Sequence, residues 1–308
     1  MTRSPKPLRS AFIAAVAAAL LSTVAPSAHG AQAAATADLV QIKPSAADPR
    51  VVRFDDPDVV LVPQDSTAST PLVVFLPGTG GKPAMSIPFL RVIAAQGYRV
   101  ISLDYDDEPA VQQVCPRDPD PACAADFRRM RVEGAGPSRT VSNPPEEGVE
   151  QRLVALIRTL DRSRPGEGWG DYLDGDHPAW WRMVLSGLSQ GAGMAAFIAK
   201  AHETERVVLF SSPWDFTGPG RMPAPWLSAP SATPPERWWA EYNARELTAA
   251  AIQRAYAALR IPPDHQRVFD RDLPAGCAAR SPNPYHGITI RDPAYTEDWR
   301  WLFSRPAG

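Results

Sequence analysis

A short stretch around Ser189 holds residue types that can do chemistry. Residues 183–193 read Met-Val-Leu-Ser-Gly-Leu-Ser-Gln-Gly-Ala-Gly, and a helix-prone run of small residues follows. The pattern Gly-x-Ser-x-Gly between a strand and a helix is typical of a nucleophile elbow, a tight turn that exposes its serine. A glycine-rich turn without a chemical role is the alternative, but the strand before it and the helix after it favour the nucleophile.

A serine hydroxyl needs a base to take its proton before it attacks. Four histidines follow residue 30: His177, His202, His265 and His286. Three of them fit poorly as the base. His177 and His265 precede strands and so lie at the wrong end of the sheet, and His202 lies in or just after the elbow helix. His286, in Asn-Pro-Tyr-His-Gly, comes after the last predicted strand. It alone fits the chain order serine, acid, histidine, so we predict it to be the base.

The acid that orients the histidine has two main candidates. Asp215 follows the strong predicted strand 206–210 and lies in a sharp Pro-Trp-Asp turn. Glu246 follows a weaker strand, at the usual position for the acid, and opens a predicted helix. Either carboxylate could instead only cap a turn or complement a helix N-terminus. We favour Asp215, because its strand is the better defined. Two weaker candidates precede His286: Asp270 and Asp272.

The developing negative charge on the attacked carbonyl needs backbone N–H donors. One donor in such sites is the residue after the nucleophile, here Gln190. The other comes from a loop after an early strand, and Pro77-Gly78-Thr79-Gly80-Gly81 is that loop, with Thr79 as the donor. A phosphate-binding loop is excluded, because Gly81-Lys82 is followed by Pro83 and not by serine or threonine.

Strands and helices alternate along the chain, which predicts an α/β fold with a mostly parallel, doubly wound sheet flanked by helices. The catalytic candidates then follow the carboxyl ends of strands, where such sheets bind ligands. Weak strand signals occur at 50–54 and 59–62, and residues 105–145 and 212–237 read as long loops. The predicted strands are 71–76, 98–103, 183–186, 206–210, 237–242 and 266–269, and the predicted helices are 87–96, 146–161 and 247–259.

Together these features resemble the α/β-hydrolase superfamily, and more narrowly a poorly characterised family of secreted bacterial hydrolases. The resemblance implies a serine hydrolase whose nucleophile is Ser189. Two departures stand out: Leu188 replaces a histidine common beside the serine, and Asn243-Ala244-Arg245-Glu246 replaces a turn that often contains an aspartate. The matching segments are Leu76 to Gly81, the loop between Cys115 and Cys123, 169–173, 186–193, 211–215 and 225–227.

The N-terminus reads as a Sec-type signal peptide. Its basic residues precede an uncharged apolar run, 11–25, that is shorter than the ~20 residues a membrane span needs. Small residues favour cleavage after Gly30 or after Ala33. We therefore expect a signal peptide at 1–30, a single α/β-hydrolase domain at 31–308, and a secreted or periplasmic protein without a stable membrane anchor.

Charge and cysteine content narrow the function further. The 308 residues carry a net charge of −2, which becomes −5 once the three cations of residues 1–30 are removed, so a strongly basic nucleic-acid binder is excluded. Cys115 and Cys123 flank a short Pro/Asp-rich loop, and an exported protein would join them in a disulfide. Cys277 would then be free or compete for a partner. No metal-ligand spacing surrounds these cysteines.

The sequence thus predicts a carboxylic-ester hydrolase that works through an acyl-enzyme, on a small-molecule or polymeric ester. Its catalytic residues are Ser189, His286 and Asp215, or Glu246 in place of Asp215. The mechanism needs no cofactor and no metal. The alternative is an inactive member of the same fold that binds a ligand in the same cleft.

Overall fold

The computed structural model describes residues 1–2, 37–218, 221–275 and 282–305. The predicted signal peptide, both cleavage positions and Cys277 lie outside these residues. The central element is an eight-stranded sheet with the order β1-β2-β4-β3-β7-β8-β11-β12. Its strands are β1 (Ala37–Ile42), β2 (Asp58–Pro63), β3 (Leu72–Leu76), β4 (Arg99–Ser102), β7 (Met183–Leu188), β8 (Arg206–Phe210), β11 (Trp238–Asn243) and β12 (Gln266–Phe269).

Strand direction identifies the fold. β2 runs antiparallel to both of its neighbours, β1 and β4. All pairings from β4 to β12 are parallel. This mostly parallel sheet with an antiparallel second strand is the α/β-hydrolase fold, which confirms the fold expected from the sequence.

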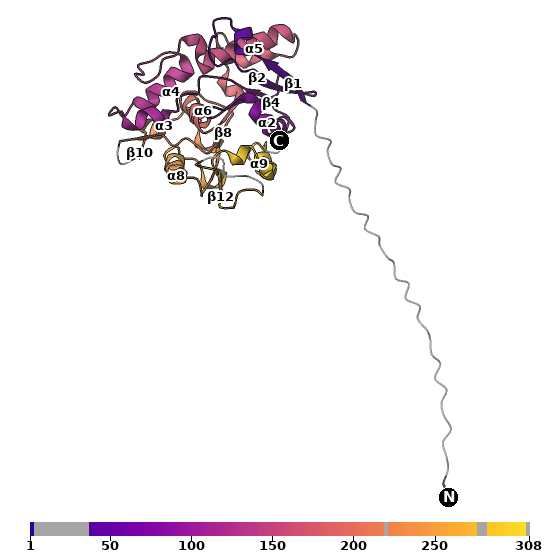
Figure 1. Ribbon diagram of the computed structural model, residues 1–308. Helices are drawn as coiled ribbons and strands as arrows, with labels where there is room; N and C mark the ends of the chain where they lie inside the picture. Colours follow the sequence, from indigo (N-terminus) through magenta and orange to yellow (C-terminus); the bar gives the residue numbers. More distant parts are fainter. Residues whose placement is uncertain (3–36, 219–220, 276–281, 306–308) are drawn as a thin grey trace. The chain divides into compact units, whose positions relative to one another are not determined.

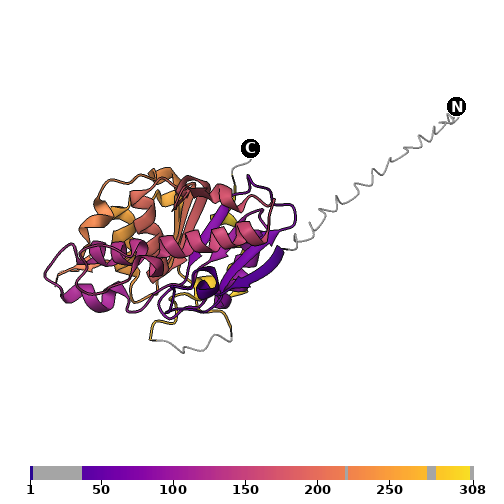
Figure 2. The ribbon, with the colours of Figure 1, turned by 90° about the horizontal axis from the view of Figure 1, so that it is seen from above.

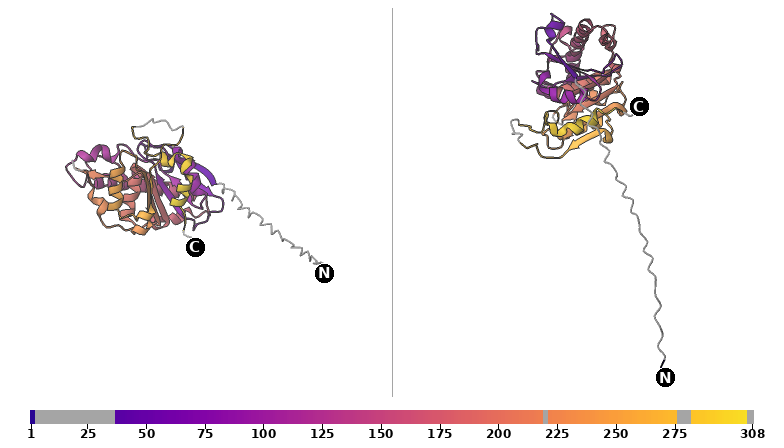
Figure 3. Two further views of the ribbon diagram at one scale, coloured as in Figure 1. Left: turned by 90° about the horizontal axis from the view of Figure 1, so that it is seen from below. Right: turned by 90° about the vertical axis from the view of Figure 1, so that its right-hand side faces the viewer.

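The sheet is buried on both faces, because successive side chains of each strand point to opposite sides. In β3, Val73 and Phe75 pack into one core, whereas Leu72, Val74 and Leu76 pack into the other. Figure 1 shows the two helical layers, with α5 in front of the strands in Figure 2 and α9 on the opposite side in Figure 3. One layer contains α4 (Cys123–Glu133), α5 (Val149–Ser163), α6 (Gln190–Ala201) and α8 (Ala249–Ala258), and the other contains α2 (Ile87–Ala94) and α9 (Thr296–Leu302).

Helix α5 follows directly from its apolar periodicity. Five apolar side chains recur every three or four residues, and all are buried against the sheet: Val149, Leu153, Leu156, Ile157 and Leu160. Helix α2 has a proline in its first turn, and the chain reverses after it at Gly97, whose φ of 84° suits glycine. No helix within the described residues is long and apolar enough to cross a bilayer.

Two segments differ from the sequence prediction. The first strand is β1, whereas the weak signal at 50–54 is a bend in which Phe54 has a φ of 49°. β1 is an edge strand that is half exposed, so backbone pairing with β2 holds it and apolar residues do not mark it. The predicted loop 105–145 contains α4, whose buried face includes the arginines Arg128 and Arg131. A helix that buries charge carries little apolar periodicity.

The cysteine prediction is confirmed for one pair. Cys115 and Cys123 form a disulfide with their Cα atoms 5.5 Å apart, at the beginning of α4. The remaining short elements are α1 (Pro44–Ala47), α3 (Val111–Val114), α7 (Pro225–Ser228), and the two-stranded ribbons of β5 (Leu173–Asp174) with β6 (His177–Pro178) and of β9 (Phe216–Thr217) with β10 (Met222–Pro223).

Candidate active site

Ser189 occupies the turn between β7 and α6. Its φ of 54° and ψ of −118° are rare for a residue with a side chain, and its N–H donates to the carbonyl of Phe210 at 2.9 Å. The neighbouring glycines permit the turn. A Cβ at Gly191 would lie 1.9 Å from the carbonyl oxygen of Leu76, and one at Gly187 would lie 2.4 Å from the Gly191 carbonyl carbon. The local backbone thus has the strained serine and the small neighbours that the predicted nucleophile elbow requires.

His286 lies beside this serine. It comes from the loop after β12, where its N–H donates to the carbonyl of Asn283 at 3.1 Å. Its Nε2 lies 2.8 Å from Oγ of Ser189, and its Nδ1 lies 2.7 Å from Oε2 of Glu246. The imidazole thus bridges a hydroxyl and a carboxylate, as a base that shuttles a proton must.

Glu246 is a fully buried carboxylate in the loop after β11. Besides His286, it accepts hydrogen bonds from the Ser211 hydroxyl at 2.6 Å, the Asn243 N–H at 3.1 Å and the Thr248 hydroxyl at 3.3 Å. These neutral donors fix the carboxylate and leave its charge to the imidazole.

The structure places Asp215 elsewhere, so the prediction that it orients His286 is wrong. Its carboxylate accepts two hydrogen bonds from Arg128, at 2.7 and 2.6 Å, and both side chains are fully buried. Trp226 donates at 3.0 Å and Gln112 at 3.2 Å. With every nearby donor on its oxygens, Asp215 has no free position for an imidazole. Glu246, the alternative carboxylate, is the one beside His286.

The predicted oxyanion loop packs against the serine. A Cβ at Gly78 would lie 3.0 Å from Cβ of Ser189, so a side chain there would push against the serine and glycine favours this approach. Thr79 lines the same cavity as Ser189, and Gln190 is the first residue of α6. Among the described residues, no hydrogen-bond partner occupies the N–H of Thr79 or of Gln190. Both donors are free to meet a charge that develops near Ser189.

A cavity of about 220 Å³ opens over the serine. Leu188, the residue that departs from the family pattern, contributes an apolar wall beside the nucleophile. The lining combines the catalytic candidates with apolar side chains and two cations: Ser189, His286, Met85, Leu188, Ile290, Lys82 and Arg291.

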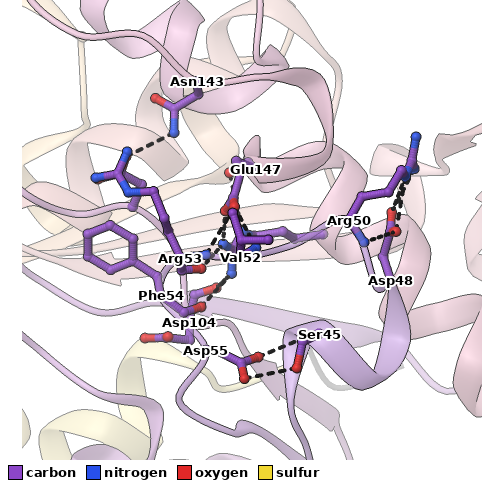
Figure 4. Close-up of polar contacts among 12 residues, drawn as sticks. Ser45, Asp48, Arg50, Val52, Arg53, Phe54, Asp55, Asp104, Asn143 and Glu147 are labelled. Atoms are coloured by element: carbon purple, nitrogen blue, oxygen red, sulfur yellow. Dashed lines mark hydrogen bonds and ion pairs between the residues drawn. The ribbon is translucent and has the colours of Figure 1, made fainter.

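Lys82 is held by a network of acids behind the oxyanion loop. Its ammonium lies 2.8 Å from Asp56 and 3.6 Å from Asp104, and the Asp56 N–H donates to Asp104 at 2.9 Å. Burial raises the pKa of the nearby Asp107 carboxyl to about 7, and Lys82 opposes that rise. Figure 4 shows the adjoining contacts, in which Glu147 accepts two backbone N–H groups beside Asp104. The network anchors the loop that carries Thr79.

Sequence reasoning missed Glu241, a fully buried carboxyl on β11. The hydroxyl of Thr289 donates to it at 2.7 Å, three residues after His286 in the chain. Burial raises the pKa of Glu241 well above its ordinary value, and the neighbouring charge of Glu246 adds to the rise. Through Thr289, Glu241 therefore ties the histidine loop to the sheet. An isolated acid in a strand gives no sequence signal for this role.

Among the residues that the structure describes, no group of three or more histidine, cysteine, aspartate or glutamate side chains is arranged to hold a metal ion. The arrangement can activate a hydroxyl. Ser189, His286 and Thr79 line one cavity, Glu246 is hydrogen-bonded to the far side of His286, and Gln190 directly follows the serine.

No protein-family model and no curated protein matches the chain. Solved structures with a similar fold include a dienelactone hydrolase described as putative, from Klebsiella pneumoniae, at 14% identity and a TM-score of 0.45, covering 87% of this chain and 99% of that one. Esterase 2 from Thermogutta terrifontis is 14% identical with a TM-score of 0.44, and the match covers 88% of this chain and 92% of that one. A thermostable esterase from Pseudomonas putida is 11% identical with a TM-score of 0.44, and the match covers 87% of this chain and 82% of that one. The α/β-hydrolase fold of the chain itself is established by its strand order and directions.

Proposed function

We propose that the protein is a serine hydrolase that cleaves carboxylic esters. The observation that carries this proposal is the unbroken hydrogen-bonded series from Ser189 through His286 to Glu246, at the edge of a cavity. A structural serine needs neither a base at hydrogen-bond distance nor a strained backbone that exposes it.

The proposed reaction follows from the positions of these groups. His286 Nε2 takes the proton of Ser189 as Oγ attacks the ester carbonyl carbon, and the N–H groups of Thr79 and Gln190 stabilise the oxyanion. Glu246 holds the imidazole in the right tautomer and stabilises its charged form. His286 then protonates the departing alcohol, which leaves an acyl-enzyme. Water, activated by the same histidine, releases the acid and restores Ser189.

A catalytically inactive binding protein of the same fold is the competing function. Two observations favour the enzyme: the φ of 54° at Ser189, and the unpartnered N–H groups of Thr79 and Gln190 beside it. A protein that only bound a ligand would gain nothing from storing this strain at a serine. Leu188 does not oppose catalysis, because the position it occupies is not that of the base, which His286 fills.

Hydrolysis of p-nitrophenyl acetate and butyrate tests the proposal. Ser189→Ala should lower kcat by about 10⁴ to 10⁶-fold, as expected when the nucleophile of such a triad is removed. Ser163→Ala, on α5 and away from the cavity, is the matched control and should keep its activity. Equal rates for the wild type and Ser189→Ala would refute the assignment.

Export is a further part of this proposal. The disulfide between Cys115 and Cys123 supports an oxidising compartment, as does the signal-like segment 1–30. N-terminal sequencing of exported protein should begin at Ala31 or Ala34, and an intact Met1 would contradict cleavage.

A further inference from the structure

We propose that the preferred substrates are short esters that carry a carboxylate besides the ester group, and that Arg291 binds this carboxylate. The inference rests on the proposed function, because it names the substrate class of the same cavity. Four observations support it: the place of Arg291, its lack of a partner, the pairing of the other cation in the cavity and the size of the cavity.

Arg291 lies close to the catalytic histidine. Its N–H donates to the carbonyl of Ile288 at 3.0 Å, which forms a turn directly after His286. The guanidinium carbon lies 3.8 Å from the position that a Cβ of Gly287 would take. Arg291 lines the same cavity as Ser189. A ligand that reaches the nucleophile therefore comes within range of this cation.

The guanidinium of Arg291 has no partner in the part of the chain that the structure describes, neither an ion pair nor a side-chain hydrogen bond. Its neighbours differ, since Arg300 pairs with Glu297 and Arg271 pairs with Asp298 at 3.0 Å. None of the segments outside the described residues contains an aspartate or glutamate. Within the described residues, the five side-chain N–H donors of Arg291 are thus available to a ligand.

The other cation among the residues that line the cavity is Lys82, and it is already paired. Lys82 is balanced by Asp56 at 2.8 Å and Asp104 at 3.6 Å. Among the described residues, Arg291 is therefore the cation of this lining that has no acidic partner, and the one available to a negatively charged group.

A cavity of about 220 Å³ has room for a short ester chain. A carboxylate on such a chain can accept two parallel hydrogen bonds from the planar guanidinium, whereas an ammonium would bind it only as a point charge. The carboxylate can belong to the acyl part or to the alcohol part of the ester. The test therefore includes one substrate of each kind.

Mono-p-nitrophenyl succinate carries the charge on its acyl part and is compared with p-nitrophenyl butyrate. 4-Butyryloxybenzoate carries it on the alcohol part and is compared with its methyl ester. In Arg291→Gln, the kcat/KM ratio of charged to neutral ester should fall about tenfold for one of the two pairs, as expected for the loss of one charge-assisted contact. Arg300→Gln makes the same change of net charge outside the cavity and should leave both ratios unchanged.

The pair whose ratio falls identifies the part of the substrate that Arg291 binds. Unchanged ratios for both pairs, or an equal fall in Arg300→Gln, would overturn the inference. Binding of mono-p-nitrophenyl succinate and 4-butyryloxybenzoate to Ser189→Ala protein, measured by calorimetry, tests Arg291 without turnover. When Arg291→Gln is added to the Ser189→Ala protein, the affinity for one of the two ligands should fall about tenfold. If Arg291→Gln left the binding of both ligands unchanged, this inference would be refuted. If the wild type did not hydrolyse the neutral esters, the proposed function would be refuted.

Discussion

Two buried carboxylates follow neighbouring strands of the sheet and have opposite surroundings. Asp215 comes after β8 and meets Arg128 from α4, with Trp226 and Gln112 on the same oxygens. Glu246 comes after β11 and is held by a serine, a threonine and a backbone N–H, with His286 on its remaining side. Position after a strand is common to both. The element that packs over each carboxylate decides its role.

The difference is one of charge compensation. A fixed, permanent cation neutralises Asp215. The same guanidinium donates to the carbonyl of Gln190 at 3.4 Å, so the pair supports the packing of α6 and has no contact with His286. Neutral donors hold Glu246, so its charge remains available to stabilise the imidazolium that forms when His286 takes a proton. The first arrangement supports the fold, and the second is the one that the proposed reaction requires.

The largest expected effect comes from removing the charge of Glu246. Glu246→Gln should lower kcat by roughly 10⁴, because the histidine can then adopt the wrong tautomer and loses its charge partner. Steady-state kinetics with p-nitrophenyl butyrate measures the change. Asp215→Asn is the matched control and should keep its rate within about tenfold of the wild type. A large loss in Asp215→Asn with a normal rate in Glu246→Gln would reverse the comparison.

Asp215 should matter for stability instead. Asp215→Asn leaves the buried guanidinium of Arg128 without a counter-charge, which typically costs about 3–5 kcal/mol in the free energy of unfolding. Urea denaturation at neutral pH measures this loss. The double variant Arg128→Met/Asp215→Leu should recover most of it, since an apolar pair of similar volume can replace a buried ion pair. A fully stable Asp215→Asn protein would show that the pair contributes nothing.

A third buried carboxyl sharpens the comparison through pH. Burial raises the pKa of Glu241 above that of the unfolded chain, so the folded state keeps a proton that the unfolded state loses. The stability that this group contributes is complete below the unfolded pKa and declines as pH rises toward the folded value. Glu241→Gln should remove this decline. The free energy of unfolding of the variant, relative to that of the wild type, should therefore be higher at pH 8 than at pH 5. Urea titrations at both pH values test it, and identical pH profiles would contradict it.

Much of the site is accessible from the sequence, because its parts depend on local rules. The elbow around Ser189 needs small residues at fixed spacing, and the place of His286 follows from chain order. The acid does not follow from local rules, because Arg128 reaches Asp215 from a helix 87 residues earlier in the chain. Apolar periodicity revealed α5 but not α4, whose buried face is charged. The edge strand β1 was missed because backbone pairing defines it.

Covalent labelling of the purified protein with a fluorophosphonate probe tests the central claim most directly. The probe reacts only with a serine that a neighbouring base has activated. Peptide mapping of the labelled wild type should locate the adduct on Ser189, Asp215→Asn should label at a similar rate, and Glu246→Gln should label far more slowly. A folded wild-type protein that takes up no label, or labels elsewhere than Ser189, would contradict the account.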